Sequence, residues 1–470
     1  MNDSSMLINS LPARIMPRSM GMKLIVVCGL ALVMVIPALF VAGLVNDRTN
    51  RAADVVREIS GHVGGQQTFL GPTLAIPYNI PPQSVGDHAR HGMYLVFPAR
   101  ASAVLKTTTE ERRRSLFKVP VFQADLNFDA TFDLSGVPAA APQGAELDWS
   151  RAEIVVGVSD ARGALADATL TTDGKTLTLV PAEIAQDMSI SDDQSQHIKL
   201  TLFGARVEGI AKPSAQFNVT SALRFSGAQR IAVLAYGKTT HLNVQGDWPS
   251  PGFDGGFLPV TRTVSNNGFT AEWSVPFIAR GVRAEGPGDS INGLDATALG
   301  VSFIEVADPY QSVNRSLKYV PLFLGLLFLS YFVFEVTTGK RIHPAQYVLV
   351  GMAQIIFYLL LLSLAERIGF NFGFLFAGAA TVALLSANAA WVFASRLQGI
   401  RALGIFTLLY VLIYMLLRLE DNALLVGAIA SFLAVAAAMY FTRGIDWYSS
   451  LPVSGAAKPP TTLPAPKETA

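Results

Sequence analysis

Five apolar runs between residues 317 and 443 constrain this chain more than any other feature of its sequence. Each is close to the roughly 20 residues that a helix needs to cross the hydrocarbon core of a bilayer. The loops between the runs are short and hold nearly all the charge of this region. Inside a bilayer, only a helix or a closed barrel pairs every backbone polar group. Residues 317–443 are therefore predicted to form a bundle of five transmembrane helices.

A further apolar run occupies residues 23–45, directly after a basic segment, residues 1–22. A cleaved signal peptide has the same order, but its apolar part is only about 7–15 residues long. The greater length of this run favours an uncleaved transmembrane helix, which Pro37 should kink. Residues 46–62 keep apolar side chains at helical spacing, so we expect the helix to continue until Gly61, Gly64 and Gly65 end it.

The pattern changes to short strands and turns in residues 46–316. Leu126–Leu134 alternates apolar and polar residues with a period of two, which is typical of a half-buried strand. Leu170–Val180 indicates a hairpin around Asp173–Gly174. Further strands are expected at Leu74–Tyr78, Tyr94–Phe97, Glu153–Val158, Ile198–Phe203, Ala215–Phe225, Ile231–Ala235, Thr270–Ile278 and Gly300–Val306. These segments predict a mostly β domain, either one sandwich-like unit or two stacked units.

Basic residues in the short loops predict which way the helices cross the membrane, because cytoplasmic loops are enriched in Lys and Arg. With the N-terminus in the cytoplasm, eight basic residues face inward, namely Arg14, Arg18, Lys23, Lys340, Arg341, Arg396, Arg401 and Arg443. The outer short loops hold two, Arg367 and Arg418. Basic residues of the long β domain count less, since long segments translocate largely regardless of charge. Both ends of the chain are therefore predicted to be cytoplasmic, and residues 46–316 periplasmic.

The predicted fold class is a multi-domain membrane protein with one N-terminal transmembrane helix, a large mostly β periplasmic domain and a C-terminal bundle of five transmembrane helices. The Pro-, Ala- and Thr-rich end, residues 444–470, is expected to be a disordered cytoplasmic tail. The one cysteine, Cys28, excludes an internal disulfide and a cysteine-rich metal site. A large β domain without cysteine suits the periplasm of a Gram-negative cell.

Catalytic and cofactor motifs are missing from the sequence: it has no G-x-S-x-G, no P-loop and no H-E-x-x-H. The formal net charge of +1 gives no basic face for a nucleic acid. Asp87, His88 and His91 resemble a metal cluster, but their loop-like surroundings and the lack of further ligands nearby favour a solvated loop. We expect no cofactor, no metal and no nucleic-acid partner, and no class of enzyme is indicated.

Polar and aromatic residues gather where the β domain meets the second membrane helix. They are Asp308, Tyr310, Gln311, Arg315, Lys318 and Tyr319. Tyr and Lys suit the headgroup layer of a bilayer, so an interfacial anchor is the simpler interpretation. The alternative hypothesis is a coupling element that transmits the state of the β domain to the bundle.

Glu335 lies near the inner end of the same helix. An acid inside a membrane helix marks a functional site by default. Lys340 and Arg341 are close enough in sequence to pair with it, or it could reach water, and either would give it no functional role. His343 precedes the next helix and is expected to be a cap or an interface group, with pH sensing as the alternative.

Charged residues also occupy the outer loops of the bundle, at Glu366, Arg418, Glu420 and Asp421. We interpret them as solvated charge at helix ends, with a polar lid facing the β domain as the alternative. The uncharged polar residues that could line a path through the bundle are Gln354, Asn388 and Thr407. Small residues repeated at intervals of three to four in the last helices favour close helix packing over such a path.

Six long segments carry the most distinctive order of residues, namely Gln67–Tyr78, Arg113–Leu126, Asp308–Leu326, Arg341–Phe370, Arg418–Gly427 and Arg443–Tyr448. In these segments the chain resembles the CreD family of inner-membrane proteins. The likeness covers most of the chain from the first helix to residue 448. It implies an envelope protein associated with envelope stress, with a two-component regulon and, in some members, with tolerance of β-lactams and colicins. It implies no catalytic residues, because the family has no established catalytic mechanism.

Three functions are compatible with these observations. The first is non-enzymatic: the periplasmic β domain binds an unidentified envelope protein or glycan and supports envelope integrity, with membrane lipids around the helices. The second is a transporter or lipid-handling protein that uses the helix bundle, and the third is a membrane-embedded enzyme. The large β surface and the lack of motifs favour the first. A polar cavity at mid-membrane would favour the second, and a closed bundle with a grooved β domain would favour the first.

Overall fold

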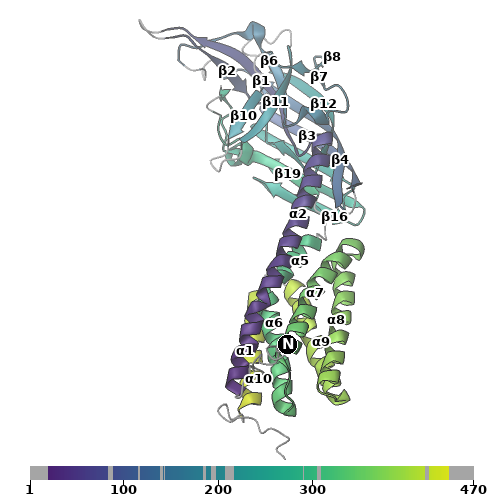
Figure 1. The fold of residues 1–470 in the computed structure, drawn as a ribbon. Helices are drawn as coiled ribbons and strands as arrows, with labels where there is room; N and C mark the ends of the chain where they lie inside the picture. Colours follow the sequence, from purple (N-terminus) through teal and green to yellow (C-terminus); the bar gives the residue numbers. More distant parts are fainter. Residues whose placement is uncertain are drawn as a thin grey trace, which may run out of the picture. The chain divides into compact units, whose positions relative to one another are not determined.

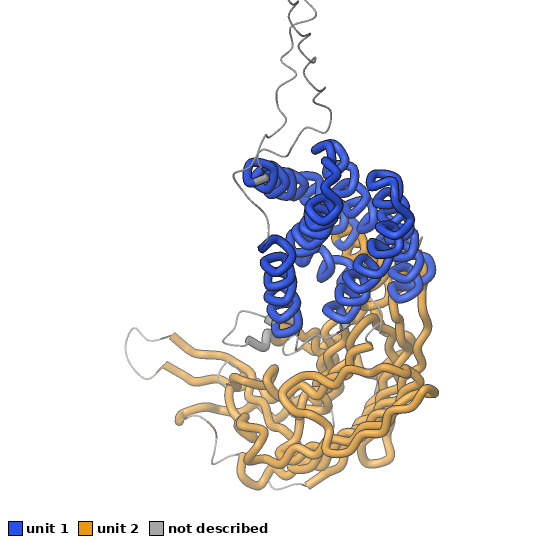
Figure 2. Tube along the Cα trace, turned by 90° about the horizontal axis from the view of Figure 1, so that it is seen from below, with its two compact units in different colours: residues 1–49, 307–470 blue, residues 50–306 orange. Residues whose placement is uncertain are grey.

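The computed structural model describes residues 20–82, 88–114, 117–137, 141, 143–183, 187–191, 197–206, 216–288, 291–303, 309–418 and 423–443. The chain divides into two compact units (Figure 2). The first comprises residues 1–49 and 307–470 and is helical, and the second comprises residues 50–306 and is mostly β.

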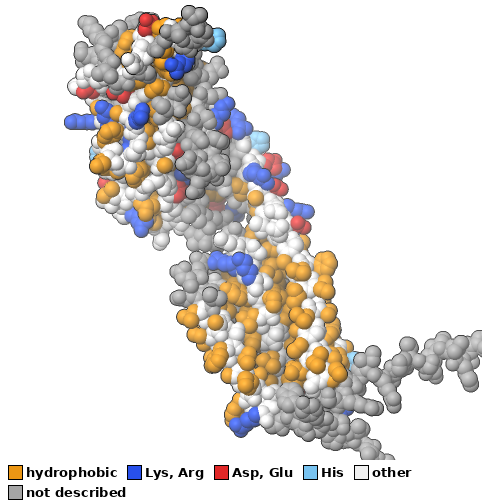
Figure 3. Space-filling model, turned by 90° about the vertical axis from the view of Figure 1, so that its left-hand side faces the viewer, with side chains coloured by type: hydrophobic (Ala, Val, Ile, Leu, Met, Phe, Trp, Pro, Cys, Tyr) orange, Lys and Arg blue, Asp and Glu red, His pale blue; other side chains and the backbone are white. Residues whose placement is uncertain are grey.

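Among the described residues, six helical stretches are long and apolar enough to cross a membrane. The helices are α1 (Met20–Val33), α2 (Val35–Val63), α5 (Pro309–Lys318), α6 (Val320–Thr338), α7 (Pro344–Ile368), α8 (Phe370–Val392), α9 (Arg396–Arg418) and α10 (Ala423–Thr442) (Figure 1). α1 and α2 together provide the first stretch, and α6 to α10 provide the other five. Apolar side chains cover the visible face of these helices (Figure 3). The prediction of one N-terminal apolar helix and a C-terminal five-helix bundle is confirmed.

The first helix is interrupted near Pro37, as predicted. Proline has no N–H to donate to the carbonyl four residues earlier, and α1 ends at that residue, Val33. The next backbone hydrogen bond, from Ala38 N to Met34 O, is long at 3.4 Å. The Met34 side chain packs here against Gly351 of α7, where a Cβ atom would lie 2.8 Å from Met34 Cγ. A larger residue at position 351 would therefore push the first helix away from α7.

The β unit contains two sheets. The eleven-stranded sheet comprises β1 (Gln67–Ile80), β2 (Arg90–Val96), β5 (Glu146–Leu147), β6 (Glu153–Val158), β9 (Val180–Pro181), β10 (Asp187–Ser191), β11 (His197–Arg206), β13 (Arg230–Leu234), β15 (Pro251–Gly255), β18 (Glu285–Pro287) and β19 (Ala298–Phe303). The eight-stranded sheet comprises β3 (Arg100–Arg114), β4 (Phe117–Asp133), β7 (Thr169–Thr172), β8 (Lys175–Thr178), β12 (Gln216–Ala228), β14 (Thr239–Gly246), β16 (Thr261–Ser265) and β17 (Gly268–Val275). Short helical turns lie at η1 (Trp149–Arg151), η2 (Ala161–Gly163), α4 (Phe277–Arg280) and η4 (Asp295–Thr297).

Strand order shows how the two sheets are built from distant parts of the chain. The first sheet has the order β10-β11-β6-β1-β13-β19-β15, with β2, β5, β9 and β18 paired to strands of this path. The second has the order β16-β17-β14-β3-β4-β12-β7-β8. Strand pairs are antiparallel except for β1 with β13 and β3 with β14, among the described residues. Each parallel pair joins strands that are far apart in the sequence.

The two sheets share one hydrophobic core. Phe69 of β1 and Leu126 of β4 belong to the same cluster of buried side chains. The β unit is therefore one large sandwich-like unit, and the alternative of two stacked units is wrong. Strands of the second sheet, such as β3, β4 and β12, alternate buried and exposed residues and so place one face toward this core. β1 and β6 of the first sheet are instead buried along most of their length.

The two clearest strand predictions are confirmed. Within β4, Leu126, Phe128 and Ala130 are buried while the polar residues between them are exposed. The predicted hairpin consists of β7 and β8, joined by Asp173 and Gly174. Both turn residues have positive φ, 48° and 76°, as a two-residue type I′ turn requires.

Beyond its apolar part, α2 continues to Val63, as the spacing of its apolar residues predicted. Val56 and Ile59 pack there against a small buried cluster, which consists of Val63, Val119, Val121 and Ala228. Gly64 ends the helix with a φ of +94°, and a Cβ at this position would lie 2.6 Å from the Cα of Gly163. The helix therefore ends where the chain passes close to η2.

Tyr94 of β2 is fully buried, and its hydroxyl has no hydrogen-bond partner among the described residues. Burial, with a smaller effect of the Glu285 carboxylate, raises the pKa of Tyr94 from 10.0 to about 12. The unfolded chain therefore releases this proton at a lower pH than the folded chain. Stability contributed by Tyr94 is complete below pH 10 and is lost as the pH rises toward 12.

We therefore expect Tyr94→Phe to reduce the loss of stability between pH 10 and 12. At neutral pH the variant should be as stable as the parent or more stable, because it removes a buried hydroxyl without a partner. Thermal unfolding of both proteins across this pH range measures the difference. If both proteins lost the same amount of stability between pH 10 and 12, the loss could not be assigned to Tyr94.

Candidate functional site

The polar centre of the helical unit is Glu335, whose side chain is 1% exposed. One carboxylate oxygen, Oε1, accepts hydrogen bonds from the Lys23 ammonium of α1 and from the backbone N–H of Ile342, the latter at 3.0 Å. The other, Oε2, accepts one from the hydroxyl of Tyr347 at 3.0 Å. Lys23 also donates to the carbonyl oxygen of Ile342 at 2.8 Å. These four residues form a buried ion-pair cluster that joins α1, α6, the α6–α7 turn and α7.

The turn between α6 and α7 positions this cluster. Gly339 ends α6 in the left-handed conformation, with a φ of 67°, and its N–H donates to the carbonyl of Glu335 at 3.0 Å. Pro344 then begins α7, where its missing N–H costs nothing. The short connection turns the backbone of Ile342 back toward the carboxylate, and Tyr347 follows one turn into α7.

The partner of Glu335 differs from the prediction. Lys340 and Arg341, the expected partners, are near in sequence but do not contact the carboxylate in the described structure. Lys340 donates instead to the carbonyl of Phe393, at the end of α8. Lys23 lies 312 residues away in sequence, and from the sequence it is counted only among the basic residues expected on the cytoplasmic side. Its place within the apolar run 23–45, and not in the basic segment before it, was the signal that could have identified it.

The cluster satisfies the two charges that it buries. A buried ion pair is tolerated when its remaining donors and acceptors also have partners. Here the carboxylate accepts three hydrogen bonds and the ammonium donates two. The ring of Tyr347 also packs edge-on against that of Phe328, with the ring centres 5.6 Å apart. The arrangement holds the first helix in the bundle, and the described residues place no second acid beside it for a proton relay.

The three polar residues proposed for a path are not brought together. Gln354 of α7 is buried and accepts a hydrogen bond from the hydroxyl of Tyr410 at 2.8 Å. Asn388 of α8 accepts one from Tyr331 at 3.1 Å and donates to Gln346 at 3.4 Å. These are bonds between helices, which fix their packing.

Two grooves on the helical unit are lined mainly by apolar side chains. Asn388 lies in one, between α7 and α8, and Thr407 lies in the other, between α8 and α9. Gln354 lines neither of them. Within the described part of the chain, we therefore find no polar cavity that contains all three residues.

The predicted coupling residues lie on α5 and at the start of α6. The Tyr310 hydroxyl donates to Glu366 of α7 at 3.0 Å, so two residues predicted as separate sites are in contact. Lys318 is exposed, Gln311 is exposed and Arg315 is partly buried. Tyr319 is the residue that precedes α6. Their roles as anchors or coupling residues stay predictions.

The other predicted residues are placed as follows. His343 caps α7, because its Nδ1 accepts a hydrogen bond from the N–H of Ala345 at 3.2 Å. Arg418 is the last residue of α9. Asp308, Glu420 and Asp421 lie outside the described residues, as does Asp87. In the described ranges, no group of three or more His, Cys, Asp or Glu residues is arranged to hold a metal ion.

These features define a class: a multi-pass membrane protein that carries a large, mostly β domain between its first apolar helix and a five-helix bundle. The family model described as inner membrane protein CreD matches residues 19–448, so this chain belongs to the CreD family. It is 30% identical over 447 residues to the inner membrane protein CreD of Escherichia coli (strain K12). The match covers 92% of this chain and 95% of that protein. The protein is thus a multi-pass protein of the inner membrane.

Proposed function

We propose that this protein supports cell envelope integrity and the envelope stress response without catalysis, by binding an envelope component through its β domain. We further propose that this domain is periplasmic and that both ends of the chain are cytoplasmic. Lys23 and the α6–α7 turn meet at the ion-pair cluster, which supports placing them on the same side of the membrane. The excess of basic residues at these helix ends supports the cytoplasm as that side.

A cleft in the β unit is the observation that carries the proposal. It has a volume of about 780 Å³ and lies beside β1, β2 and β5. Its lining includes Tyr78, Asn79, His91, Glu146, Asp148 and Arg151. Hydrogen bonds from Ser150 lower the pKa of Asp148, so this carboxylate stays ionised at neutral pH. An aromatic ring beside carboxylate, amide and guanidinium groups suits a polar ligand such as a glycan or a peptide of the envelope.

The transporter alternative receives less support. It requires a polar path across the bundle, and Gln354 and Asn388 are engaged in hydrogen bonds between helices. The two grooves on the helical unit are mainly apolar and open at the surface. A lipid-handling role stays compatible with such grooves, but a route for a polar substrate is not supported by them.

Removing the imidazole and the guanidinium that line the cleft tests the proposal. We expect His91→Ala/Arg151→Ala to lower survival under envelope stress at least tenfold in a strain that lacks the chromosomal gene, relative to the parent chain. Lys175→Ala, an exposed change on β8 of the other sheet, is the matched control and should leave survival unchanged. Equal membrane levels of all three proteins must be shown by immunoblot. Full survival with the cleft variant would contradict the proposal.

A second experiment tests the orientation. Alkaline phosphatase, which is active only outside the cytoplasm, is inserted at the exposed turn of Gly174. Activity at this position, and none for a fusion after Arg443, is the expected result. The opposite pattern would reverse the proposed orientation.

A further inference from the structure

The groove between α8 and α9 has dimensions that match one leaflet of a bilayer. Its volume is about 650 Å³. Along α8 its lining begins at Asn371, in the first turn, and ends at Ala383, near the middle of the helix. At 1.5 Å per residue, this length is about 18 Å. The hydrocarbon core is about 30 Å thick, so the groove extends from one membrane surface to just past the midplane.

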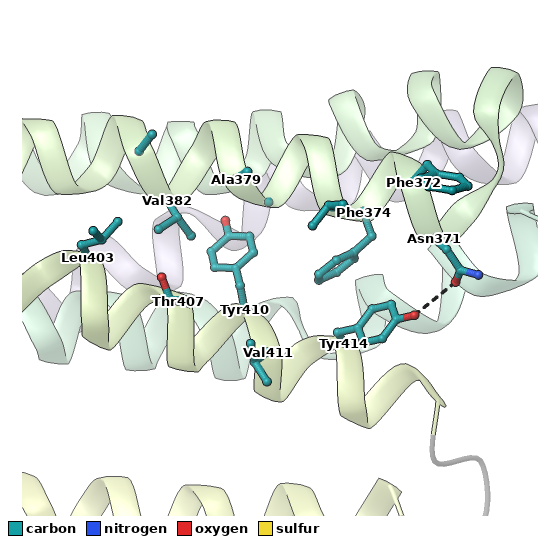
Figure 4. A pocket seen from close by; sticks show the side chains of 13 residues that line it. Asn371, Phe372, Phe374, Ala379, Val382, Leu403, Thr407, Tyr410, Val411 and Tyr414 are labelled. Carbon is teal, nitrogen blue, oxygen red and sulfur yellow. Dashed lines mark hydrogen bonds between the residues drawn. The ribbon is translucent and has the colours of Figure 1, made fainter.

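Exposed residues of α8 line the opening of this groove, namely Phe372, Leu375, Ala379 and Ala383, and the buried rings of Phe374 and Tyr410 form its floor. Gly378 lies against the ring of Tyr410, where a Cβ atom would lie 3.2 Å from a ring carbon. Ala379 and Ala383 leave space beside it, and both are exposed. The Tyr410 hydroxyl donates a hydrogen bond to Gln354, so the ring of Tyr410 is the part of this side chain that borders the groove (Figure 4).

The two ends of the groove differ in polarity. The end at the start of α8 holds Asn371 and Tyr414, whose side chains are joined by a hydrogen bond of 3.3 Å (Figure 4). Phe372 lies at this same end and is 62% exposed. The other end of the groove holds Leu403 and Thr407 of α9, near the middle of the bundle. A phospholipid has the same order, with a polar ester and headgroup region followed by an apolar chain.

From this match of length, position and polarity, we propose that the α8–α9 groove is a binding site for one acyl chain of a membrane phospholipid. The lipid belongs to the leaflet at the end that holds Asn371 and Tyr414, and these residues lie at the depth of its ester groups. The chain lies along Ala379 and Ala383 and ends near Thr407. This site is independent of the β-domain function proposed above.

The test uses the full-length protein, purified in detergent, stripped of lipid and titrated with phosphatidylglycerol while bound lipid is counted by native mass spectrometry. Ala379→Leu/Ala383→Leu fills the groove from α8 without displacing buried side chains, because both alanines are exposed. The matched control is Ala428→Leu/Ala436→Leu, which adds the same atoms to exposed positions of α10. We expect the parent and the control to bind one lipid with equal affinity, and the filled variant to bind it at least tenfold more weakly.

Further measurements decide between this occupant and others. Thr407→Leu fills the groove from α9 and should weaken binding in the same direction, which keeps the test valid if the double variant does not fold. Glycerol phosphate, which has the headgroup chemistry but no chain, should not bind. The proposal is overturned if the filled variants bind phosphatidylglycerol as the parent does. It is also overturned if they abolish a dimer and leave lipid binding unchanged, since the occupant would then be a second copy of this chain.

Discussion

Glu335→Leu is expected to destabilise the helical unit by about 3–5 kcal/mol, because it leaves the Lys23 ammonium buried without a counter-charge. Lys23→Met should destabilise the unit by a similar amount, because it leaves the Glu335 carboxylate buried without a counter-charge. The double variant Lys23→Met/Glu335→Leu removes both charges and should be more stable than either single variant. Unfolding of the full-length protein in mixed micelles with increasing dodecyl sulfate, followed by circular dichroism, measures these differences.

The control for this prediction uses the partner expected from the sequence. Lys340→Met/Glu335→Leu should show no recovery relative to Glu335→Leu, because Lys340 donates to Phe393 and not to the carboxylate. The structure would be contradicted if this variant were more stable than Glu335→Leu and if the losses of stability caused by Lys23→Met and Glu335→Leu were additive. Those results would assign the ion pair to Lys340.

Tyr236→Ala is expected to destabilise the β unit by about 3–5 kcal/mol, the usual cost of truncating a buried aromatic side chain. Tyr236 follows β13 of one sheet, and its hydroxyl donates to the carbonyls of Ser102 and Asp129 in the other sheet, at 2.7 and 2.9 Å. Its ring packs edge-on against Phe128, with the ring centres 5.1 Å apart. One side chain therefore crosses the whole core.

Tyr236→Phe separates the two contributions, because it keeps the ring and removes the hydroxyl. It should cost about 1 kcal/mol, the net value of a typical hydrogen bond. The β unit holds three of the five tryptophans of the chain, Trp149, Trp248 and Trp273, so thermal unfolding followed by tryptophan fluorescence reports mainly on this unit. Equal losses for Tyr236→Phe and Tyr236→Ala would show that the hydroxyl alone holds the sheets together at this point.

Local patterns in the sequence were sufficient to predict many elements of the fold, but not the strands β3 and β14 or the helix α5, for which no element was predicted. The alternation in Leu126–Leu134 and the turn residues Asp173 and Gly174 each act over a few neighbouring residues. The apolar runs of the bundle act in the same way, since burial in lipid depends on the residues of one helix. These elements form as predicted because no distant residue is needed to specify them.

Pairings between distant segments were not predictable in this way. The parallel pair of β3 and β14 brings Ala101 beside Thr240, and no local pattern records that pairing. The pairing of Lys23 with Glu335 was not predictable either, because in the sequence a lysine at this place is typical of a helix end. A buried charge is recognised only when its partner is known, and here the partner lies in another helix.

The ion-pair cluster also sets an order for biogenesis. Lys23 leaves the ribosome 312 residues before Glu335, and bacterial translation at about 5–20 residues per second makes that delay roughly 15 to 60 s. During this interval the ammonium of the newly inserted helix has to reach toward the lipid headgroups for solvation. Capture of the first span by the rest of the bundle is therefore a late event of assembly, and nascent chains that stop before residue 335 should lack the ion pair that holds this span in place.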